Sequence, residues 1–230
     1  MTKRLKNTLG VILTVLLCVT MFLGCRCEGV PPRYWGDTIE KGGRILDDLR
    51  YNDDGANVRI IRYEGTGGTV TIPTVIDGMP VTDIRGYAFC ETKLTGITIP
   101  NGVIRIAHYA FCNNKLAEVI IPDSILSIKG GVFKGNQLTF VSISNNVTSI
   151  EESCFKDNKL ANISIPENIF IIEANAFTNN QLTSITIGAN VILYPNSFGN
   201  VFENIYNAGG CKLAGTYTRE DVTSRDWTRQ

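Results

Sequence analysis

The chain has few of the residue groupings on which enzyme chemistry depends. It contains one histidine, His108, and no sequence-local partner for it is evident. No serine or cysteine nucleophile signature is present. The glycine-rich stretch Gly65–Gly68 is not followed by the lysine and hydroxyl residue that a phosphate-binding loop needs. We therefore expect no enzyme activity, no cofactor, and a surface or packing role for His108. A catalytic site assembled from scattered residues would show itself only as perturbed titratable groups in a cleft.

An excess of basic residues is also missing. The chain carries 22 Lys and Arg against 22 Asp and Glu. Residues 1–24 contain three basic residues and no acidic residue, so 22 − 3 leaves 19 basic against 22 acidic residues in the remainder, a formal charge of −3. Nucleic-acid recognition begins with a concentrated basic face. Because the sequence shows no such face, nucleic acid is not expected as a partner.

The seven cysteines lack the spacing of a metal site. Cys25 and Cys27 form a CxC pair, but no second pair or histidine cluster accompanies it, so a zinc site is weakly supported and no metal is predicted. Cys154 is most simply a buried thiol. The roles of Cys27 and Cys211 are left open.

The N-terminus is predicted to be a targeting segment and not part of the fold. Three basic residues precede an uncharged stretch, Leu9–Leu23, which is followed by Gly24 and Cys25. The tetrad Phe22–Cys25 resembles a bacterial lipobox, which implies a lipid on Cys25 as the membrane attachment. The alternative is an uncleaved anchor, because this stretch is just under the length that spans a bilayer. Either way the remaining chain would lie outside the cytoplasm, tethered to a membrane at the cell surface or in the periplasm.

Phenylalanine recurs at a nearly constant interval through the rest of the chain. The spacings are 22, 22, 22, 22 and 21 residues, at Phe89, Phe111, Phe133, Phe155, Phe177 and Phe198. Such regularity indicates stacked coils, each of which cannot bury its apolar side alone. Stacking yields one long surface instead of one pocket, and this geometry favours binding over catalysis.

Each unit also contains a segment of alternating character. A leucine series starts it, at Leu94, Leu116, Leu138, Leu160 and Leu182. Two β-branched series follow three and five residues later, starting at Ile97 and Ile99. Most residues between these two series are small or polar, which predicts a short strand with one buried face.

The pattern LxxIxIPxxVxxIxxxAFxxN, from Leu94 to Asn114, resembles the BspA-like, or treponemal, class of bacterial leucine-rich repeats. The resemblance covers roughly residues 58–218, and the segment Val70–Phe89 is typical of the family's first repeat. It implies a leucine-rich repeat solenoid with short parallel strands on one face and irregular or short helical return segments on the other. The family often carries a cysteine three residues after the phenylalanine, and this chain has asparagine there. We interpret Asn114, Asn136, Asn158 and Asn180 as a ladder that bonds the backbone at a turn.

The predicted organisation has five parts. They are a lipoprotein-type signal peptide in 1–24, a spacer in 25–45, an N-terminal cap in 46–69, leucine-rich repeats of 22 residues in 70–198 and a C-terminal cap in 199–230. Caps are needed because an uncovered terminal coil exposes core and an unpaired strand edge.

Both caps have recognisable sequence signals. Leu49–Tyr51 and Val58–Tyr63 flank a turn-rich loop, which predicts a hairpin in the N-terminal cap. In the C-terminal cap, Asn200–Gly210 is typical of a short helix, and Lys212–Arg219 of a final strand.

Cys90 and Cys112 occupy the same repeat position in adjoining coils. Neighbouring coils stack at about 4.8 Å, which is within the roughly 4.4–6.8 Å between Cα atoms that a disulfide accepts. A disulfide is therefore geometrically allowed, and two stacked free thiols are the alternative.

The outward strand face is the predicted functional surface. Its central row comprises Thr71, Thr98, Ile120, Ser142, Ser164 and Thr186, and its neighbouring row comprises Gly96, Glu118, Phe140, Asn162 and Ser184. The hydroxyl residues by themselves suit any exposed strand. The sharper hypothesis is that Ile120 and Phe140, diagonal neighbours, anchor a protein partner within a hydrogen-bonding surround. Its candidate residues are Thr98, Ile120, Phe140, Ser142, Asn162 and Ser164.

Two functions follow from these features. The family resemblance implies a membrane-tethered protein that adheres to host or matrix proteins or to other cells. The alternative is a periplasmic structural or assembly protein that binds another component of the envelope. Protease treatment of intact cells would distinguish the two, because it removes a surface protein and spares a periplasmic one.

Overall fold

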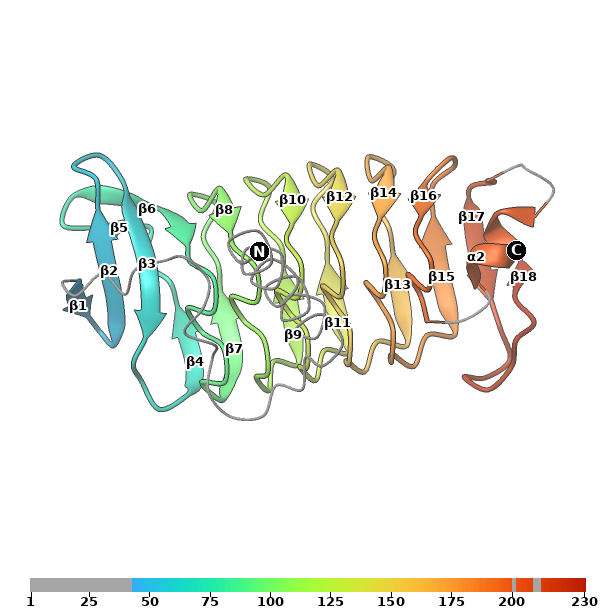
Figure 1. Ribbon diagram of the computed structural model, residues 1–230, viewed down its shortest axis with the longest axis horizontal. Coiled ribbons are helices and arrows are strands. Elements are labelled where there is room, and N and C mark those ends of the chain that lie inside the picture. Colours follow the sequence, from blue (N-terminus) through green and yellow to red (C-terminus); the bar gives the residue numbers. More distant parts are fainter. Residues whose placement is uncertain (1–42, 200–201, 209–211) are drawn as a thin grey trace, which may run out of the picture. The chain divides into compact units, whose positions relative to one another are not determined.

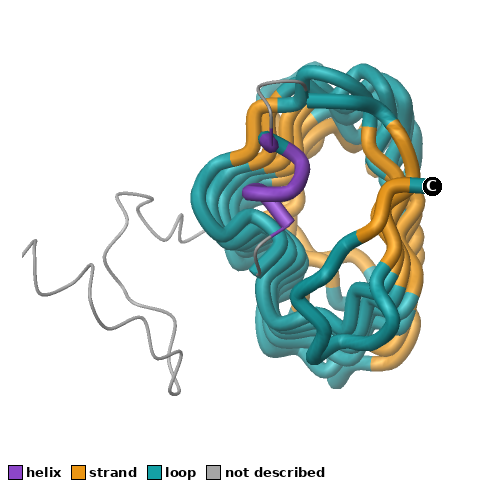
Figure 2. Tube along the Cα trace, turned by 90° about the vertical axis from the view of Figure 1, so that its right-hand side faces the viewer, coloured by secondary structure: helices purple, strands orange, loops and turns teal. Residues whose placement is uncertain are grey.

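The computed structural model describes residues 43–199, 202–208 and 212–230, all within one compact unit that spans Glu40–Gln230. The predicted signal peptide, most of the predicted spacer, and Cys25, Cys27 and Cys211 lie outside the described residues. Successive turns of chain stack side by side in this unit (Figure 1). Viewed along the stack, the turns superimpose as one oval ring (Figure 2). The predicted solenoid is therefore confirmed.

Each coil contributes one strand to a set that we call the first ladder. Its members are β7 (Leu94–Thr98), β9 (Glu118–Ile120), β11 (Phe140–Ser142), β13 (Asn162–Ser164) and β15 (Ser184–Ile187). Within this set β9 pairs parallel with β11, and β13 pairs parallel with β15. Equivalent repeat positions lie opposite one another, as Val119 and Val141 do between β9 and β11. These strands form where β-branched residues alternate with small or polar ones, so that one face is buried and the other is free.

The return segments contribute a second set of strands, the second ladder, which was not predicted from the sequence. Its members are two-residue strands: β8 (Arg105–Ile106), β10 (Ser127–Ile128), β12 (Ser149–Ile150), β14 (Ile171–Ile172) and β16 (Ile192–Leu193). The last four pair parallel in this order, and β8 occupies the equivalent position but pairs with the strand Met79–Ile84. They occupy the upper row in Figure 1. Outside these strands the return segments consist of turns, which is the irregular one of the two expected forms. Residues with positive φ, such as Tyr109 at 58° and Ser153 at 57°, turn the chain within each return segment and prevent a helix.

The recurring phenylalanines stack in one file through the core. The ring centroids of successive members lie 5.0, 5.6, 5.7, 5.3 and 5.1 Å apart from Phe89 to Phe198. Tyr63 extends the file upstream, 5.6 Å from Phe89. The first five phenylalanine rings are fully buried. Since each ring stacks on its counterparts and aliphatic residues of every coil belong to the same buried cluster, the core is continuous along the stack.

The asparagine ladder is also present. Asn136 accepts a hydrogen bond from the Leu116 N–H at 3.2 Å and donates to the carbonyl oxygens of Phe111 and Phe133 at 2.9 and 3.1 Å. Asn114, Asn158 and Asn180 make the equivalent bonds, each to its own coil and to the preceding one. The amides thus tie each coil to the preceding one at the start of the first-ladder strand, as the sequence predicted.

The N-terminal strands join both ladders. β1 (Arg44–Leu46), β2 (Leu49–Asp53) and β3 (Val58–Tyr63) pair antiparallel in sequence order. β3 then pairs parallel with β6 (Met79–Ile84), which pairs with β8 of the second ladder. β5 (Val75–Ile76) pairs with β6, and β4 (Gly68–Thr71) pairs with β7 of the first ladder.

The C-terminal residues cover the last coil. β17 (Gly215–Thr218) pairs antiparallel with β15, and β18 (Thr228–Arg229) pairs with β17. The short helix α2 (Phe202–Tyr206) brings Phe202 against Phe198 with the rings edge to face at 4.9 Å. The proposed boundaries of the signal, spacer, repeats and caps stay predictions.

Candidate functional site

The predicted outward face is built by the register of the first ladder. Thr71 lies opposite Thr98, Ile120 opposite Ser142, and Ser164 opposite Thr186. The second row has the same order, with Phe140 opposite Glu118 and Asn162 opposite Ser184. All six candidate binding residues therefore lie on one side of this ladder.

Ile120 and Phe140 are the large apolar side chains on this face. Ile120 is 67% exposed and Phe140 is 53% exposed, although Val119 and Val141 beside them are buried. Since Phe140 lies opposite Glu118 and Ser142 lies opposite Ile120, the two apolar residues are diagonal neighbours on adjoining coils. Thr98, Asn162 and Ser164 are exposed, and Ser142 is half-buried.

The face continues beyond the residues that the sequence singled out. β17 adds Thr216 opposite Thr186, and their hydroxyl oxygens lie 2.9 Å apart. Glu118 is the charged residue of the two predicted rows. The face can therefore offer hydroxyl and amide hydrogen bonds around an apolar centre, and it offers little charge. A final strand was predicted in Lys212–Arg219, but its antiparallel pairing with β15 has no repeat signal, so the position of Thr216 opposite Thr186 was not predictable.

The two equivalent cysteines of the first coils are joined in a disulfide in the structure, and the Cα atoms of Cys90 and Cys112 lie 4.7 Å apart. The backbone also links these coils, because the Glu91 N–H donates to the Cys112 carbonyl at 3.0 Å. This covalent link belongs to the turns after the phenylalanines, away from the outward strand face.

His108 has a partner that is two coils away in sequence. Its Nδ1 lies 3.8 Å from Oε2 of Glu151. Lys129 Nζ lies 2.6 Å from Oε1 of the same carboxylate, and the Gly130 N–H donates to Oε2 at 3.1 Å. The carboxylate oxygens are thus occupied by ties between coils. Nothing in this arrangement activates a nucleophile. The contacts of the Glu151 carboxylate with Lys129 and Gly130 link its coil to the preceding one.

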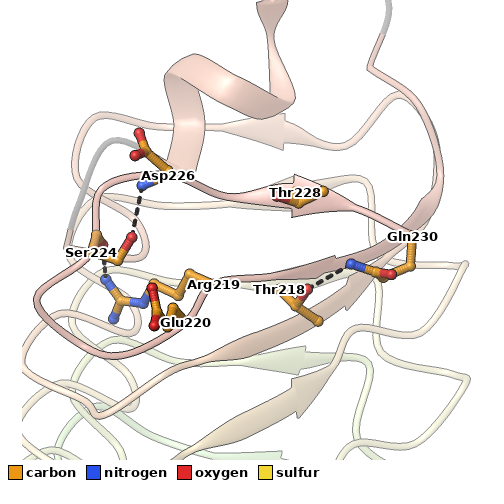
Figure 3. A pocket seen from close by; sticks show the side chains of 7 residues that line it. All are labelled: Thr218, Arg219, Glu220, Ser224, Asp226, Thr228 and Gln230. Carbon is orange, nitrogen blue, oxygen red and sulfur yellow. Dashed lines mark hydrogen bonds between the residues drawn. The ribbon is translucent and has the colours of Figure 1, made fainter.

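A shallow hollow at the C-terminal end is lined by seven polar residues of β17, β18, the loop between them and the last residue, Gln230 (Figure 3). Arg219 donates to the carbonyl oxygens of Leu182 and Ser224, at 2.6 and 3.1 Å. Its guanidinium lies 4.8 Å above the Trp227 ring, and burial lowers the pKa of Arg219. The group therefore fastens this loop to the last coil and is engaged in the fold.

The described residues contain no group of three or more His, Cys, Asp or Glu side chains that could hold a metal ion. Cys154 is fully buried as a free thiol, and desolvation raises its pKa well above the ordinary value. A buried thiol of this kind is unreactive. Within the described residues, no helix has the length and apolar character needed to cross a bilayer.

A second set of exposed apolar side chains lies along the second ladder. It was not predicted from the sequence, where only the first ladder was considered as a binding surface. We call it the apolar row. It comprises the residues that precede β8, β10, β12 and β14, which are Ile104, Leu126, Thr148 and Phe170, and Ile192, the first residue of β16, whose N–H donates to the Phe170 carbonyl. The four large side chains are 62%, 62%, 58% and 48% exposed, in chain order. The signal was available in the sequence, because Ile104, Leu126, Thr148 and Phe170 share one position of the repeat.

Comparison with known protein families matches six copies of the BspA type leucine-rich repeat region to residues 82–205, more than half of the 230 residues. No curated protein matches the chain.

Several solved structures are similar. The T. pallidum leucine-rich repeat protein has a TM-score of 0.55 and 23% identity, with 76% of this chain and 100% of that one covered. The pneumococcal vaccine antigen PcpA has a TM-score of 0.51 and 18% identity, over 65% of this chain and 50% of that one. A leucine-rich cell surface protein from Faecalibacterium prausnitzii has a TM-score of 0.39 and 24% identity, over 64% of this chain and 54% of that one. This chain thus spans about half the length of the latter two proteins. The first two similarities support the fold.

Proposed function

The chain belongs to the family of BspA-type leucine-rich repeat proteins, and on that premise we propose that it is an exported, membrane-tethered protein that binds another protein through the outward face of the first ladder. The partner is a host, matrix or envelope protein, and adhesion is the function that the family favours. The lipid on Cys25 would provide the tether.

The observation that carries this proposal is the exposure of Ile120 and Phe140 on adjoining coils. Ile120 and Phe140 are 67% and 53% exposed to solvent, although the other positions around them carry hydroxyl or amide groups or the Glu118 carboxylate. Protein interfaces concentrate binding energy in such central apolar side chains, surrounded by polar contacts that exclude water. Thr98, Ser142, Asn162 and Ser164 supply that polar surround.

The rest of the described face supports a scaffold role. The two strand ladders are fastened coil to coil by backbone bonds, the asparagine amides and the phenylalanine file, so the face is presented on regular elements. A prearranged surface loses little conformational freedom on binding. This favours recognition by shape over chemistry on a substrate.

The binding test compares the wild-type protein with a variant that carries both Ile120→Thr and Phe140→Ser. Pull-down from extracellular-matrix and envelope fractions identifies the partner, and titration then measures its affinity. We expect the variant to bind at least about tenfold more weakly, because removal of two central apolar anchors costs more than about 1.4 kcal/mol. Its melting temperature should not fall, since both side chains are exposed. Unchanged affinity would reject this patch.

A second experiment separates adhesion from the alternative, an envelope structural or assembly role. Intact cells are treated with protease, and the protein is then detected by immunoblot. Loss of the protein supports exposure at the cell surface. Protection until the envelope is permeabilised supports the periplasmic role. Labelling with a radioactive fatty acid, and its loss in Cys25→Ala, tests the lipid tether independently.

A further inference from the structure

The apolar row is a second continuous surface, distinct from the outward strand face. Backbone hydrogen bonds connect four of its members from coil to coil: Thr148 donates to Leu126, Phe170 to Thr148, and Ile192 to Phe170, at 2.8–3.1 Å. Ile104 has the same repeat position as Leu126, one coil earlier. The side chains therefore follow one another at the coil spacing, about 4.8 Å, over four steps and about 19 Å. Scattered exposed apolar residues are normal, but an ordered line of them marks an interaction site.

The charges beside the row are predominantly acidic. Asp123, Glu152, Glu167 and Glu173 lie within four residues of a row member along the chain, and none has an ion pair in the part of the chain that the structure describes. Glu173 accepts a hydrogen bond from the Glu152 N–H, which leaves its negative charge unpaired.

The basic groups near the row are already engaged. Arg105 is paired with Asp83, and Lys129 is paired with Glu151. His108 lies beside the same Glu151 carboxylate. The uncompensated charge along the row is therefore negative, and charge complementarity calls for a basic partner.

The spacing between members of the row matches the repeat of a helix better than that of an extended strand. Same-face residues of an extended strand recur at about 6.6 Å, so a strand drifts about 1.8 Å from the row at each coil. A helix has a pitch of 5.4 Å and drifts only about 0.6 Å per coil. The row is also a ridge, and the grooves between the side-chain rows of a helix accept ridges.

We infer that the apolar row is a docking surface for a basic amphipathic helix of a partner protein. About 13 residues of helix cover the 19 Å of the row at 1.5 Å per residue. Their apolar stripe contacts Ile104, Leu126, Phe170 and Ile192, and flanking Lys or Arg side chains face the carboxylates. This surface shares no residue with the outward strand face, so it stands or falls independently of the proposed function.

The test uses the purified full chain and a synthetic helical peptide of about 15 residues, with leucine every third or fourth residue and Lys and Arg on the flanks. A scrambled peptide of the same composition is the control probe. Fluorescence anisotropy should show binding of the helical peptide only. Leu126→Ser with Phe170→Ser should weaken it at least about tenfold, as loss of central anchors does. The matched control pair, Ile120→Ser with Phe140→Ser, removes equally exposed apolar side chains and should leave binding unchanged.

The acidic flanks are tested by Glu167→Gln with Glu173→Gln. We expect about three- to tenfold weaker binding and a smaller dependence on salt, because exposed charges are screened at high ionic strength. Glu118→Gln, on the other ladder, is the charge control. Equal binding of the two peptides, or equal loss in the two serine pairs, would overturn the inference.

Two other occupants would give different results. If sedimentation shows that the wild type forms dimers that Leu126→Ser with Phe170→Ser abolishes, the row binds a second copy. If vesicles of phosphatidylethanolamine and phosphatidylglycerol bind through the same residues, it contacts a bilayer. Either result contradicts a basic helical partner.

Discussion

Removal of one rung of the asparagine ladder should destabilise the solenoid by a predictable amount. Asn136 is 6% exposed and accepts a hydrogen bond from the N–H of Leu116, a fully buried residue. Asn136→Ala leaves this donor without a partner, at a cost of about 1–3 kcal/mol. The Phe111 and Phe133 carbonyl oxygens lose one bond each, but each keeps a second asparagine donor, Asn114 and Asn158 respectively. We therefore expect a total loss of about 2–4 kcal/mol in the free energy of unfolding.

Urea unfolding followed by circular dichroism measures this loss. Asn145→Ala is the matched control, because this side chain is exposed; it should change stability by less than about 0.5 kcal/mol. Asn180→Ala provides a graded test. Asn180 makes the equivalent bonds to Leu160, Phe155 and Phe177, but it is only half-buried, so water can replace part of the amide. A cost for Asn136→Ala no greater than that of Asn145→Ala would refute this reasoning.

Two further predictions concern the cysteines. Replacement of Cys90 and Cys112 by serine should lower the free energy of unfolding by about 3 kcal/mol, because the disulfide closes a loop of about 22 residues in the unfolded chain. Thiol labelling of the denatured wild type should detect two more thiols after reduction than before it. Equal labelling before and after reduction would contradict the disulfide. Because burial raises the pKa of Cys154, the folded protein keeps a thiol proton that the unfolded chain releases, so stability should fall as pH rises above about 8.5. Cys154→Ala should flatten that fall below the range where Tyr206 and Tyr217 titrate, and an unchanged slope would exclude the thiol as its cause.

The repeat positions made the first ladder and the core predictable. Phe89 and its equivalents recur with the same neighbours, and stacking coils must align equivalent positions if one apolar face is to stay buried. That condition also fixes the outward rows, and therefore the diagonal placement of Ile120 and Phe140. The asparagine ladder was predictable for the same reason, since a polar residue at a fixed repeat position meets the same backbone groups in every coil.

The second ladder was harder to predict because its strands contain only two residues, too few to show alternation. Its members are recognised only by bonds to the next coil, such as the bond from the Glu151 N–H to the Ile128 carbonyl. The pairing of β17 with β15 and the contact of His108 with Glu151 also depend on tertiary geometry. No local pattern encodes the reversal of direction in the first case, or the distance of two coils in the second.

The disulfide between Cys90 and Cys112 also has a mechanical consequence. If the tether pulls on the N-terminal end of the described chain while a partner holds Ile120 and Phe140, tension passes through the coils between these points. The covalent link bypasses the 22-residue loop in that path. The disulfide therefore prevents this loop from being pulled out to its extended length, about 75 Å at about 3.4 Å per residue. The coils beyond Phe140 bear none of this load.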